Sequence, residues 1–250
     1  MKKGRVIFTA IVMVLIVAGF IFGKVFNDLK KEKQIKVDIK EIVRAISTEN
    51  TAEEDINTIL EKRTNKKGNY SEVEDALKTY YKDLYSYLKN IKFLMDEDNF
   101  NQYLSSKNIE EDGQAFTKSM NNLKTTKDQL NDKYKEFNNQ VNDETTKASY
   151  IAGSKIDNYY KNLYLEFINE NTPTDLINNI EFKYRKTLER IDIYNDIFVF
   201  LSTNSEHWQL VDSIITFDDA LLYEKYKEIT DKLDEVTEAL SFSKVETSES

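Results

Sequence analysis

Hydrophobic residues recur at alternating spacings of three and four along most of the chain, a pattern typical of helices that pack together at a shallow angle. The pattern is regular over residues 73–94, 116–141 and 222–240, and it is looser over residues 177–201. Within residues 116–141 the single exception is Lys127. These spacings predict an all-α protein whose long helices form an elongated antiparallel bundle or coiled coil. The most regular series consists of Val73, Leu77, Tyr80, Leu84, Tyr87, Ile91 and Leu94.

Turn-forming residues divide this helical region, and the bundle domain is expected to cover residues 49–240. Residues 65–69 form a predicted loop, after which Ser71 and Glu74 match a capping box at the start of the next helix. Pro173 fits the first position of a later helix, where its missing N–H costs nothing. The helices are therefore expected to be few and long.

The helix boundaries are less clear in two further segments, residues 114–169 and residues 241–250. Residues 114–169 form either one helix or two, because Gly153 is either a hinge or a small residue inside a single helix. Residues 241–250, with the sequence SFSKVETSES, are expected to be a disordered C-terminal tail.

Residues 207–217 depart from the helical pattern. Two short runs of β-branched and aromatic residues flank Asp212 and Ser213, which predicts a small β-hairpin inserted between helices. Because an isolated hairpin is only marginally stable in water, Trp208 and Phe217 are expected to pack against the helices.

The start of the chain carries a different signal. Residues 6–23 are apolar apart from Thr9, and a helix of this length spans about 27 Å, close to the thickness of a bilayer's hydrocarbon core. We interpret residues 6–23 as a transmembrane anchor and residues 1–5 as a short cytoplasmic tail. The alternative is a cleaved signal peptide. The flanking cations that would reach lipid headgroups are Lys2, Lys3, Arg5 and Lys24.

The anchor predicts both the adjoining structure and the location of the domain. Isoleucines at positions 35, 39, 42 and 46 indicate that the helix continues as a juxtamembrane helix over residues 24–48. A short basic tail before a first apolar segment normally stays in the cytoplasm, which predicts a single-pass protein of the cell membrane with an extracytoplasmic domain. Six lysines on the other side of the anchor keep a cytoplasmic-facing domain open as the alternative.

Charge is distributed unevenly along the chain, whose formal net charge is −9. Residues 1–40 contain nine basic and three acidic residues, whereas the rest contains 26 basic and 41 acidic residues. An acidic body lacks the positive surface that nucleic-acid binding requires, so no nucleic-acid partner is expected. Six glycines and one proline over 250 residues also favour few turns and long helices.

Little in the sequence points to catalysis. Cysteine is absent and His207 is the single histidine, which excludes disulfides, thiolate chemistry and multi-histidine metal sites. The acidic clusters at residues 53–55, 96–98 and 110–112 are interpreted as solvated helix ends, and residues 110–113 lack the ligand alternation of a calcium loop. We therefore expect no catalytic residues, no metal and no cofactor.

The remaining candidate is an aromatic binding face near the hairpin, formed by Trp208, His207 and Tyr223. The alternative is that Trp208 has no binding role and closes one end of the bundle. The favoured function is a non-enzymatic, membrane-anchored scaffold or protein-interaction module at the cell envelope. Its partners would be the lipid bilayer and either another protein or a second copy, contacted through helix faces. The alternative function is an extracytoplasmic ligand-sensing domain with an aromatic pocket near residues 207–217.

Overall fold

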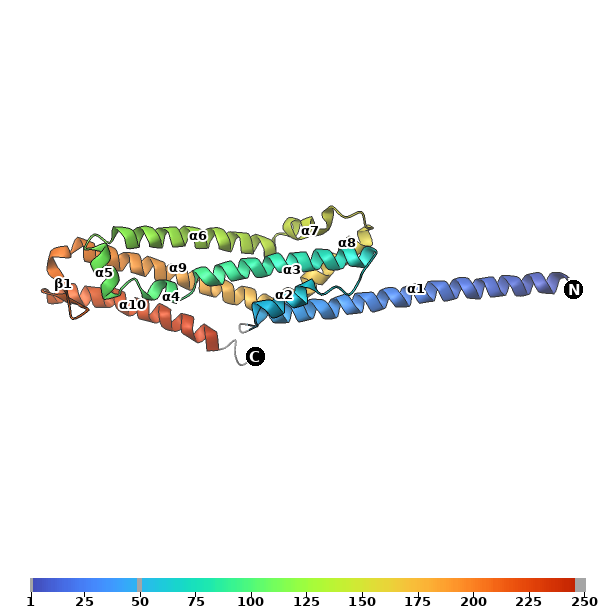
Figure 1. The fold of residues 1–250 in the computed structure, drawn as a ribbon, viewed down its shortest axis with the longest axis horizontal. Helices are drawn as coiled ribbons and strands as arrows, with labels where there is room; N and C mark the ends of the chain where they lie inside the picture. The colour runs from blue at the N-terminus through green and yellow to red at the C-terminus, as the bar shows by residue number, and fades with distance from the viewer. Residues whose placement is uncertain (1, 49–50, 246–250) are drawn as a thin grey trace. The chain divides into compact units, whose positions relative to one another are not determined.

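The computed structural model describes residues 2–48 and 51–245, and it describes side chains over residues 25–48 and 51–241. The described chain is mostly helical and contains one small antiparallel hairpin, as the sequence predicts (Figure 1). The elements are α1 (Lys2–Ser47), α2 (Glu53–Glu61), α3 (Asn69–Leu94), α4 (Asp98–Asn101), α5 (Ser106–Asp112), α6 (Thr117–Asn142), α7 (Glu144–Ala152), α8 (Asn158–Glu170), α9 (Thr174–Thr203), η1 (Ser205–His207), β1 (Trp208–Val211), β2 (Ile214–Phe217) and α10 (Ala220–Val245).

The described residues form two compact units. Unit 1 contains the described residues up to Ile46, together with Thr51–Lys82 and Lys147–Thr172. Unit 2 contains the other described residues, chiefly Asp83–Thr146 and those from Pro173 onward. Helix α3 contributes its first half to unit 1 and its second half to unit 2.

The C-terminal half of α1 forms one side of the core of unit 1. The four isoleucines at positions 35, 39, 42 and 46 are each no more than 2% exposed, so the helix continues well beyond residue 24, as predicted. Helices α1, α3 and α8 run in the same direction (Figure 1). Glu32 of α1 contacts Tyr70 and Tyr159 at the starts of α3 and α8, and one turn later Lys36 contacts Glu170 at the end of α8. The expected antiparallel packing does not hold for these three helices, since α2 and an extended loop make the return between α1 and α3.

That loop is held by a buried carboxylate. Glu74 on α3 accepts hydrogen bonds from the backbone N–H groups of Thr64 (2.8 Å) and Asn65 (2.7 Å). It also accepts from the Asn65 side chain (3.0 Å) and from the buried ammonium of Lys78 (2.9 Å). The predicted capping box is therefore wrong: α3 starts at Asn69, which places Ser71 inside the helix, and Glu74 binds the loop.

A second buried carboxylate ties the same loop to α1. Asp38 is 5% exposed and accepts hydrogen bonds from the Thr64 hydroxyl (2.6 Å) and from the Gln34 side chain (2.9 Å). The loop's polar groups are thus satisfied from two helices, which allows a non-helical segment to lie against the core.

Unit 2 is built around α9, which packs antiparallel against α6 and α10. Lys127 on α6 lies 2.5 Å from Asp192 on α9, so the one polar exception in the α6 pattern makes an interhelical ion pair. Tyr134 and Tyr184 stack at 3.8 Å between the same helices. On the other side of α9, Phe200 lies 6.4 Å from Tyr226 of α10.

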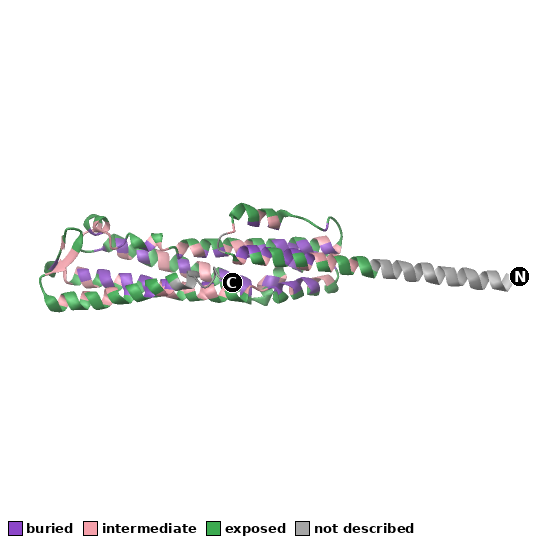
Figure 2. Ribbon diagram, turned by 90° about the horizontal axis from the view of Figure 1, so that it is seen from below, coloured by how far each residue is buried: buried purple, intermediate pink, exposed green. Residues whose placement is uncertain are grey.

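The predicted hydrophobic series are confirmed as the buried faces, although those faces are broader than predicted. Figure 2 shows buried residues (purple) along the inner sides of the helices and exposed residues (green) along the outer sides. On α3, Tyr81 and Leu88 are also buried, whereas Tyr87 and Leu94 are half-buried. The α10 series is buried only near its end, where Leu233 is 7% exposed.

The hairpin pairs β1 with β2 in antiparallel register, with Trp208 opposite Phe217 and Val211 opposite Ile214. The turn residues Asp212 and Ser213 both have positive φ (47° and 67°), as a two-residue type I′ turn requires. Directly opposed residues share a face, so Trp208 and Phe217 point together toward the helices.

Three boundaries differ from the prediction. Residues 114–169 form neither one helix nor two, because α6 ends at Asn142 and residues 153–157 separate α7 from α8. Pro173 precedes the first residue of α9 and does not occupy it. Helix α10 runs to Val245, into the predicted tail, and residues 246–250 lie outside the described residues.

The predicted anchor is not tested by the described side chains. Among the residues whose side chains are described, no helix has the length and apolar character needed to cross a bilayer. Residues 6–23 and the flanking Lys2, Lys3, Arg5 and Lys24 have side chains that lie outside the described ones.

Replacing Leu84 by Ala should destabilise the protein by about 2–5 kcal/mol, because the side chain is fully buried on α3 and its removal leaves a cavity. Leu221, at the start of α10, is 73% exposed, and its replacement by Ala should change stability by less than about 0.5 kcal/mol. Urea unfolding followed by circular dichroism measures both variants. Equal midpoints would show that Leu84 is not a core residue.

Replacing Glu74 by Gln should cost about 3 kcal/mol at neutral pH, because Lys78 and two backbone amides lose a buried carboxylate partner. Burial acts to raise the pKa of Glu74, but hydrogen bonds from Thr64, Lys78 and Asn65 outweigh it and hold the pKa below its ordinary value of 4.5. A depressed folded-state pKa stabilises the fold above the ordinary pKa, and this stabilisation is lost as pH falls through the folded-state value.

The stability gap between the native protein and this variant should therefore be constant from pH 7 to about 5 and should shrink at lower pH. Urea unfolding at a series of pH values tests this, with exposed Glu72→Gln as the matched control on the same helix. A gap that widens as the pH falls would contradict the assignment.

Candidate interaction sites

Two tyrosines converge on one carboxylate where α1 enters unit 1. The hydroxyls of Tyr70 on α3 and Tyr159 on α8 donate to the same oxygen of Glu32, over 2.8 Å and 2.7 Å. The ammonium of Lys31 lies 5.3 Å from the centre of the Tyr70 ring, and Tyr160 meets that ring edge-on at 5.1 Å. This Glu32 cluster joins three helices through side chains that α1 presents one turn before its buried isoleucines.

Different forces act on the two hydroxyls. Burial is the main cause that raises the pKa of Tyr70, and the hydrogen bond to Glu32 adds to it. The hydrogen bond to Glu32 is the main cause that raises the pKa of Tyr159 to about 12. Both phenols thus stay protonated, so they serve as hydrogen-bond donors and not as bases at neutral pH.

Of the three residues of the predicted aromatic face, Trp208 is largely buried and the other two are exposed. Trp208 is only 8% exposed, and its indole N–H donates to the carbonyl of Leu201 at 2.7 Å. His207 is exposed, with Nδ1 lying 3.2 Å from a carboxylate oxygen of Asp218. Tyr223 is 48% exposed on α10. A ligand could not stack on the indole without displacing the hairpin.

Trp208 instead ends a row of aromatic rings inside unit 2. It stacks on Phe116 at 5.9 Å, and Phe116 stacks on Phe198 at 4.8 Å. Phe116 adopts a left-handed backbone conformation with φ of 49°, which is costly for a side chain of this size and is offset here by complete burial. The row continues through Tyr103, Tyr194 and Phe100.

A buried guanidinium lies beside this row. Arg190 on α9 is 2% exposed, and its Nη2 atom lies 3.6 Å from a carboxylate oxygen of Glu97. The guanidinium also faces the ring of Phe100 at 5.5 Å. Its Nε and Nη2 atoms have no hydrogen-bond partner in the described structure, so Arg190 is held mainly by charge and by the aromatic face.

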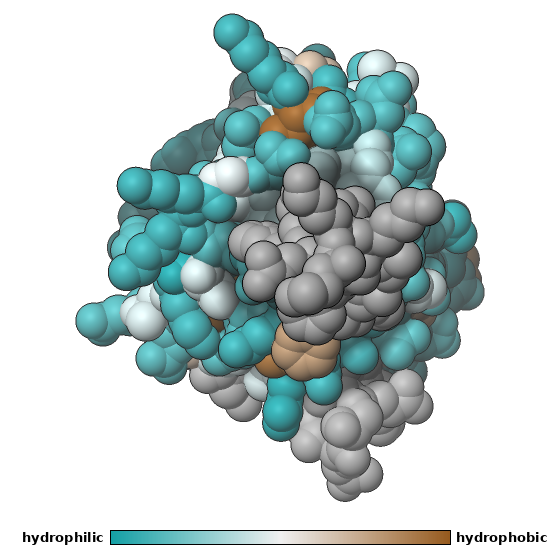
Figure 3. All heavy atoms as spheres, turned by 90° about the vertical axis from the view of Figure 1, so that its right-hand side faces the viewer, coloured by the Kyte–Doolittle hydropathy of each residue, from teal (hydrophilic) through white to brown (hydrophobic). Residues whose placement is uncertain are grey.

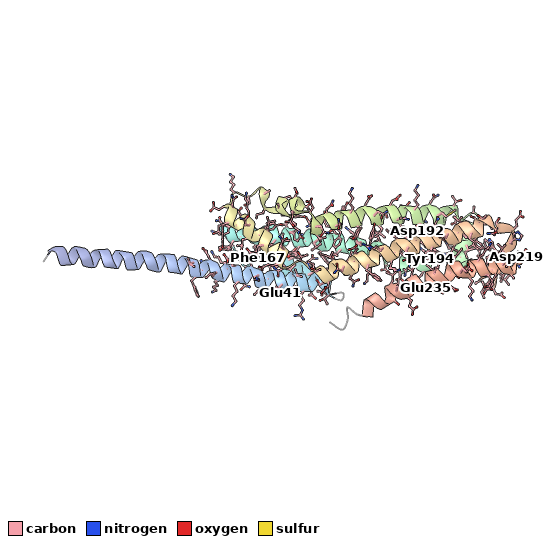
Figure 4. The ribbon with its side chains drawn as sticks, turned by 180° about the vertical axis from the view of Figure 1, so that it is seen from behind. Glu41, Phe167, Asp192, Tyr194, Asp219 and Glu235 are labelled. Atoms are coloured by element: carbon pink, nitrogen blue, oxygen red, sulfur yellow. The ribbon has the colours of Figure 1, made fainter. Side chains whose placement is uncertain are left out.

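Two shallow grooves flank the outward face of α9. The first, of about 320 Å³, lies against α6 and is lined by Met120, Lys124, Ile191, Asp192 and Asn195 among others. The second, of about 370 Å³, lies against α10 and is lined by Asp196, Val199, Phe200, Asn204, Ile229 and Lys232 among others. Figure 4 labels Asp192 and Tyr194 on α9, which is the helix shared by both grooves. Val199, which lines the second groove, is 46% exposed.

The acidic clusters have structural partners. Asp112 accepts hydrogen bonds from the backbone N–H groups of Lys118 (2.9 Å) and Ser119 (2.7 Å), and so caps the start of α6. Residues 53–55 occupy the first turn of α2, where acidic side chains are favoured. Within the residues that were searched, no group of three metal-binding side chains comes together.

Comparison of the chain with known protein families, with curated proteins and with solved structures finds no match.

Sequence reasoning missed Glu32 and Arg190, and it assigned Glu74 to a capping box and not to its buried contacts. Each is a charged residue on a helix that also has exposed charges, so composition gives no signal. The spacing provides a weak one: Arg190 and Glu74 are each adjacent in sequence to a residue of a buried series, Ile191 and Val73 respectively. A charged residue at the edge of a broad buried helix face is therefore a candidate for a buried ion pair.

Replacing Tyr70 by Phe should cost about 2 kcal/mol, because a buried donor to a carboxylate is lost. Tyr159 makes a bond of similar length but is 57% exposed, so Tyr159→Phe should cost less than about 1 kcal/mol. Thermal unfolding ranks the two variants. If the bond to Glu32 is responsible, Tyr70→Phe should add little further cost in a Glu32→Ala background, where the acceptor is absent. An undiminished cost in that background would assign the effect to packing.

Proposed function

We propose that the chain is a single-pass, membrane-anchored helical scaffold that acts at the cell envelope through protein contacts and without catalysis. The observation that carries this proposal is α1, a single helix assigned over Lys2–Ser47. It includes the apolar run of residues 6–23 at one end and the buried isoleucines of unit 1 at the other. One helix would thus belong both to the bilayer and to the folded domain.

The contacts of α1 support a fixed connection to the domain. Besides the Glu32 cluster, Lys36 lies 2.6 Å from Glu170 of α8, and Lys62 beyond α2 lies 3.7 Å from Glu41. Such exposed pairs are individually weak. Together with the buried isoleucines they attach α1 to unit 1 over several turns, which suits a helix that presents the domain at a membrane surface.

The grooves beside α9 support a role in protein binding. The outward stripe of α9 alternates by three and four residues through Asp192, Asp196, Val199 and Thr203, all of which are exposed. A helix of a protein partner, or of a second copy, could lie along this stripe and use both grooves. Charged residues of both signs, Lys124 and Lys232 with the two aspartates, line the stripe.

The second candidate is an extracytoplasmic ligand-sensing domain. Its ligand would bind in the groove lined by Phe200 and Asn204, and not at the predicted face at Trp208. These two residues lie close in sequence to the hairpin. Thermal-shift screening of envelope metabolites and cell-wall fragments tests this function. A ligand whose stabilisation is lost in Phe200→Ala, but kept in Tyr223→Ala, would support it.

Replacing Leu15 by Arg should move the full chain from the membrane fraction to the soluble fraction, because a charge at the centre of an apolar span opposes insertion by about 3 kcal/mol. Alkaline carbonate extraction followed by immunoblotting measures the distribution. Leu221→Arg, at an exposed position of α10, is the matched control and should stay with the native protein. A native chain that carbonate extracts completely would overturn the anchor.

A single cysteine introduced at the exposed Lys225 should react with a membrane-impermeant maleimide in intact cells if the domain is extracytoplasmic. The native chain has no cysteine, so it provides the unlabelled control. Reaction only after lysis would place the domain in the cytoplasm and would reject the extracytoplasmic orientation.

A further inference from the structure

One end of unit 1 collects positive charge on an otherwise acidic protein. The Glu32 cluster brings the starts of α3 and α8 against α1, so the segments that precede those helices lie at the same end of unit 1 (Figure 1). Lysines of α1 and of both segments are exposed there. They are Lys30, Lys33, Lys66, Lys67 and Lys155.

Acidic residues are fewer at this end, and one of them is occupied. The carboxylate of Glu32 is already engaged by two tyrosine hydroxyls. Asp28, Glu72 and Asp157 remain near the three segments. Figure 3 shows the side of the molecule that lies at the right in Figure 1, and hydrophilic residues (teal) cover most of its described surface. This cationic end contrasts with the rest of the chain, in which acidic residues outnumber basic ones by 41 to 26 after residue 40.

Large apolar side chains are exposed on α1 directly before these lysines. Val25 is 52% exposed, Phe26 is 73% exposed and Leu29 is 58% exposed. The buried face of α1 starts only at Ile35, so unit 1 does not cover them. Three exposed large apolar residues within five positions form a face that water solvates poorly.

The position of this apolar face along α1, directly after the proposed anchor, points to the bilayer surface as its partner. Phe26 and Leu29 lie three and six residues beyond the apolar run that ends at Gly23, which is about 4–9 Å along a helix. An interfacial helix buries its apolar face to a depth of about 5–10 Å at the boundary between headgroups and acyl chains. Lys30 and Lys33 follow seven and ten residues beyond Gly23, about 10–15 Å along the helix, and cationic side chains close to a bilayer surface are attracted to anionic headgroups.

We propose that this end of unit 1 is a lipid-binding surface. Phe26 and Leu29 lie in the interfacial layer of the bilayer, and Lys33, Lys66, Lys67 and Lys155 contact anionic lipid headgroups. The inference rests on the proposed membrane anchor. It adds that three segments of the folded domain, and not the anchor alone, touch the membrane, so that unit 1 is seated on the bilayer surface.

Fluorescence quenching in vesicles tests this proposal with the full chain. Single cysteines at exposed Asn158 and at exposed Asp55, on α8 and α2 respectively, carry a fluorophore. The protein is reconstituted in phosphatidylcholine vesicles that contain a headgroup spin-labelled lipid, with or without phosphatidylglycerol. The label at residue 158 should be quenched more strongly than the label at residue 55, and the excess should increase with phosphatidylglycerol and decrease with salt.

A charge variant and its control identify the residues responsible. The combined change Lys33→Gln, Lys66→Gln, Lys67→Gln and Lys155→Gln should abolish the excess that phosphatidylglycerol produces. The control changes the same number of exposed lysines in unit 2: Lys107→Gln, Lys135→Gln, Lys225→Gln and Lys227→Gln. It should leave the excess unchanged. Circular dichroism confirms that both variants are folded.

The outcomes separate this surface from the anchor. If the chain floats with the vesicles in a density gradient but residue 158 shows no excess quenching that depends on anionic lipid, the surface is rejected and the anchor stands. An equal effect of the two lysine variants also rejects it, since general charge would then be the cause. A chain that does not float with any vesicles rejects the anchor, and this surface with it.

Discussion

The buried carboxylate of Glu74 is the interaction on which unit 1 depends. Helices α1 and α3 can run in the same direction only if the chain returns between them, and the last part of that return is not helical. Its backbone N–H groups at Thr64 and Asn65 find their acceptor in Glu74, while the Thr64 hydroxyl finds Asp38. Without Glu74 the buried amide groups of Asn65 would lack their acceptor, and without Asp38 the Thr64 hydroxyl would lose its contact with α1, so the two acids stabilise the parallel arrangement.

Unit 2 solves a different packing problem. Helix α9 is covered on two sides, and the hairpin closes the row of aromatic rings that begins with Trp208. The buried guanidinium of Arg190 lies beside the ring of Phe100 and opposite Glu97. Trp208, the central residue of the binding surface predicted from the sequence, is therefore packed inside unit 2. The grooves beside α9 remain accessible to a partner.

The sequence predicts what depends on period and fails where partners are distant in the chain. The series from Val73 to Ile91 is buried because a spacing of three and four places those residues on one side of a helix. The hairpin was predictable from its local composition and its Asp-Ser turn. The capping box at Ser71 was wrong because Glu74 finds better donors ten residues earlier, which no local pattern reveals. For the same reason, the residues around Trp208 in the sequence do not reveal that its ring stacks on Phe116, far earlier in the chain.

The parallel packing of α1 against unit 1 also has a mechanical consequence. Its contacts are spread along the helix axis, from Glu32 through Lys36 and Asp38 to Glu41. A pull on the N-terminal end of α1 along this axis loads all of them in shear at the same moment, whereas a sideways pull would break them one after another. Tension from the start of the chain would therefore reach the domain as a whole before it could peel the helix away.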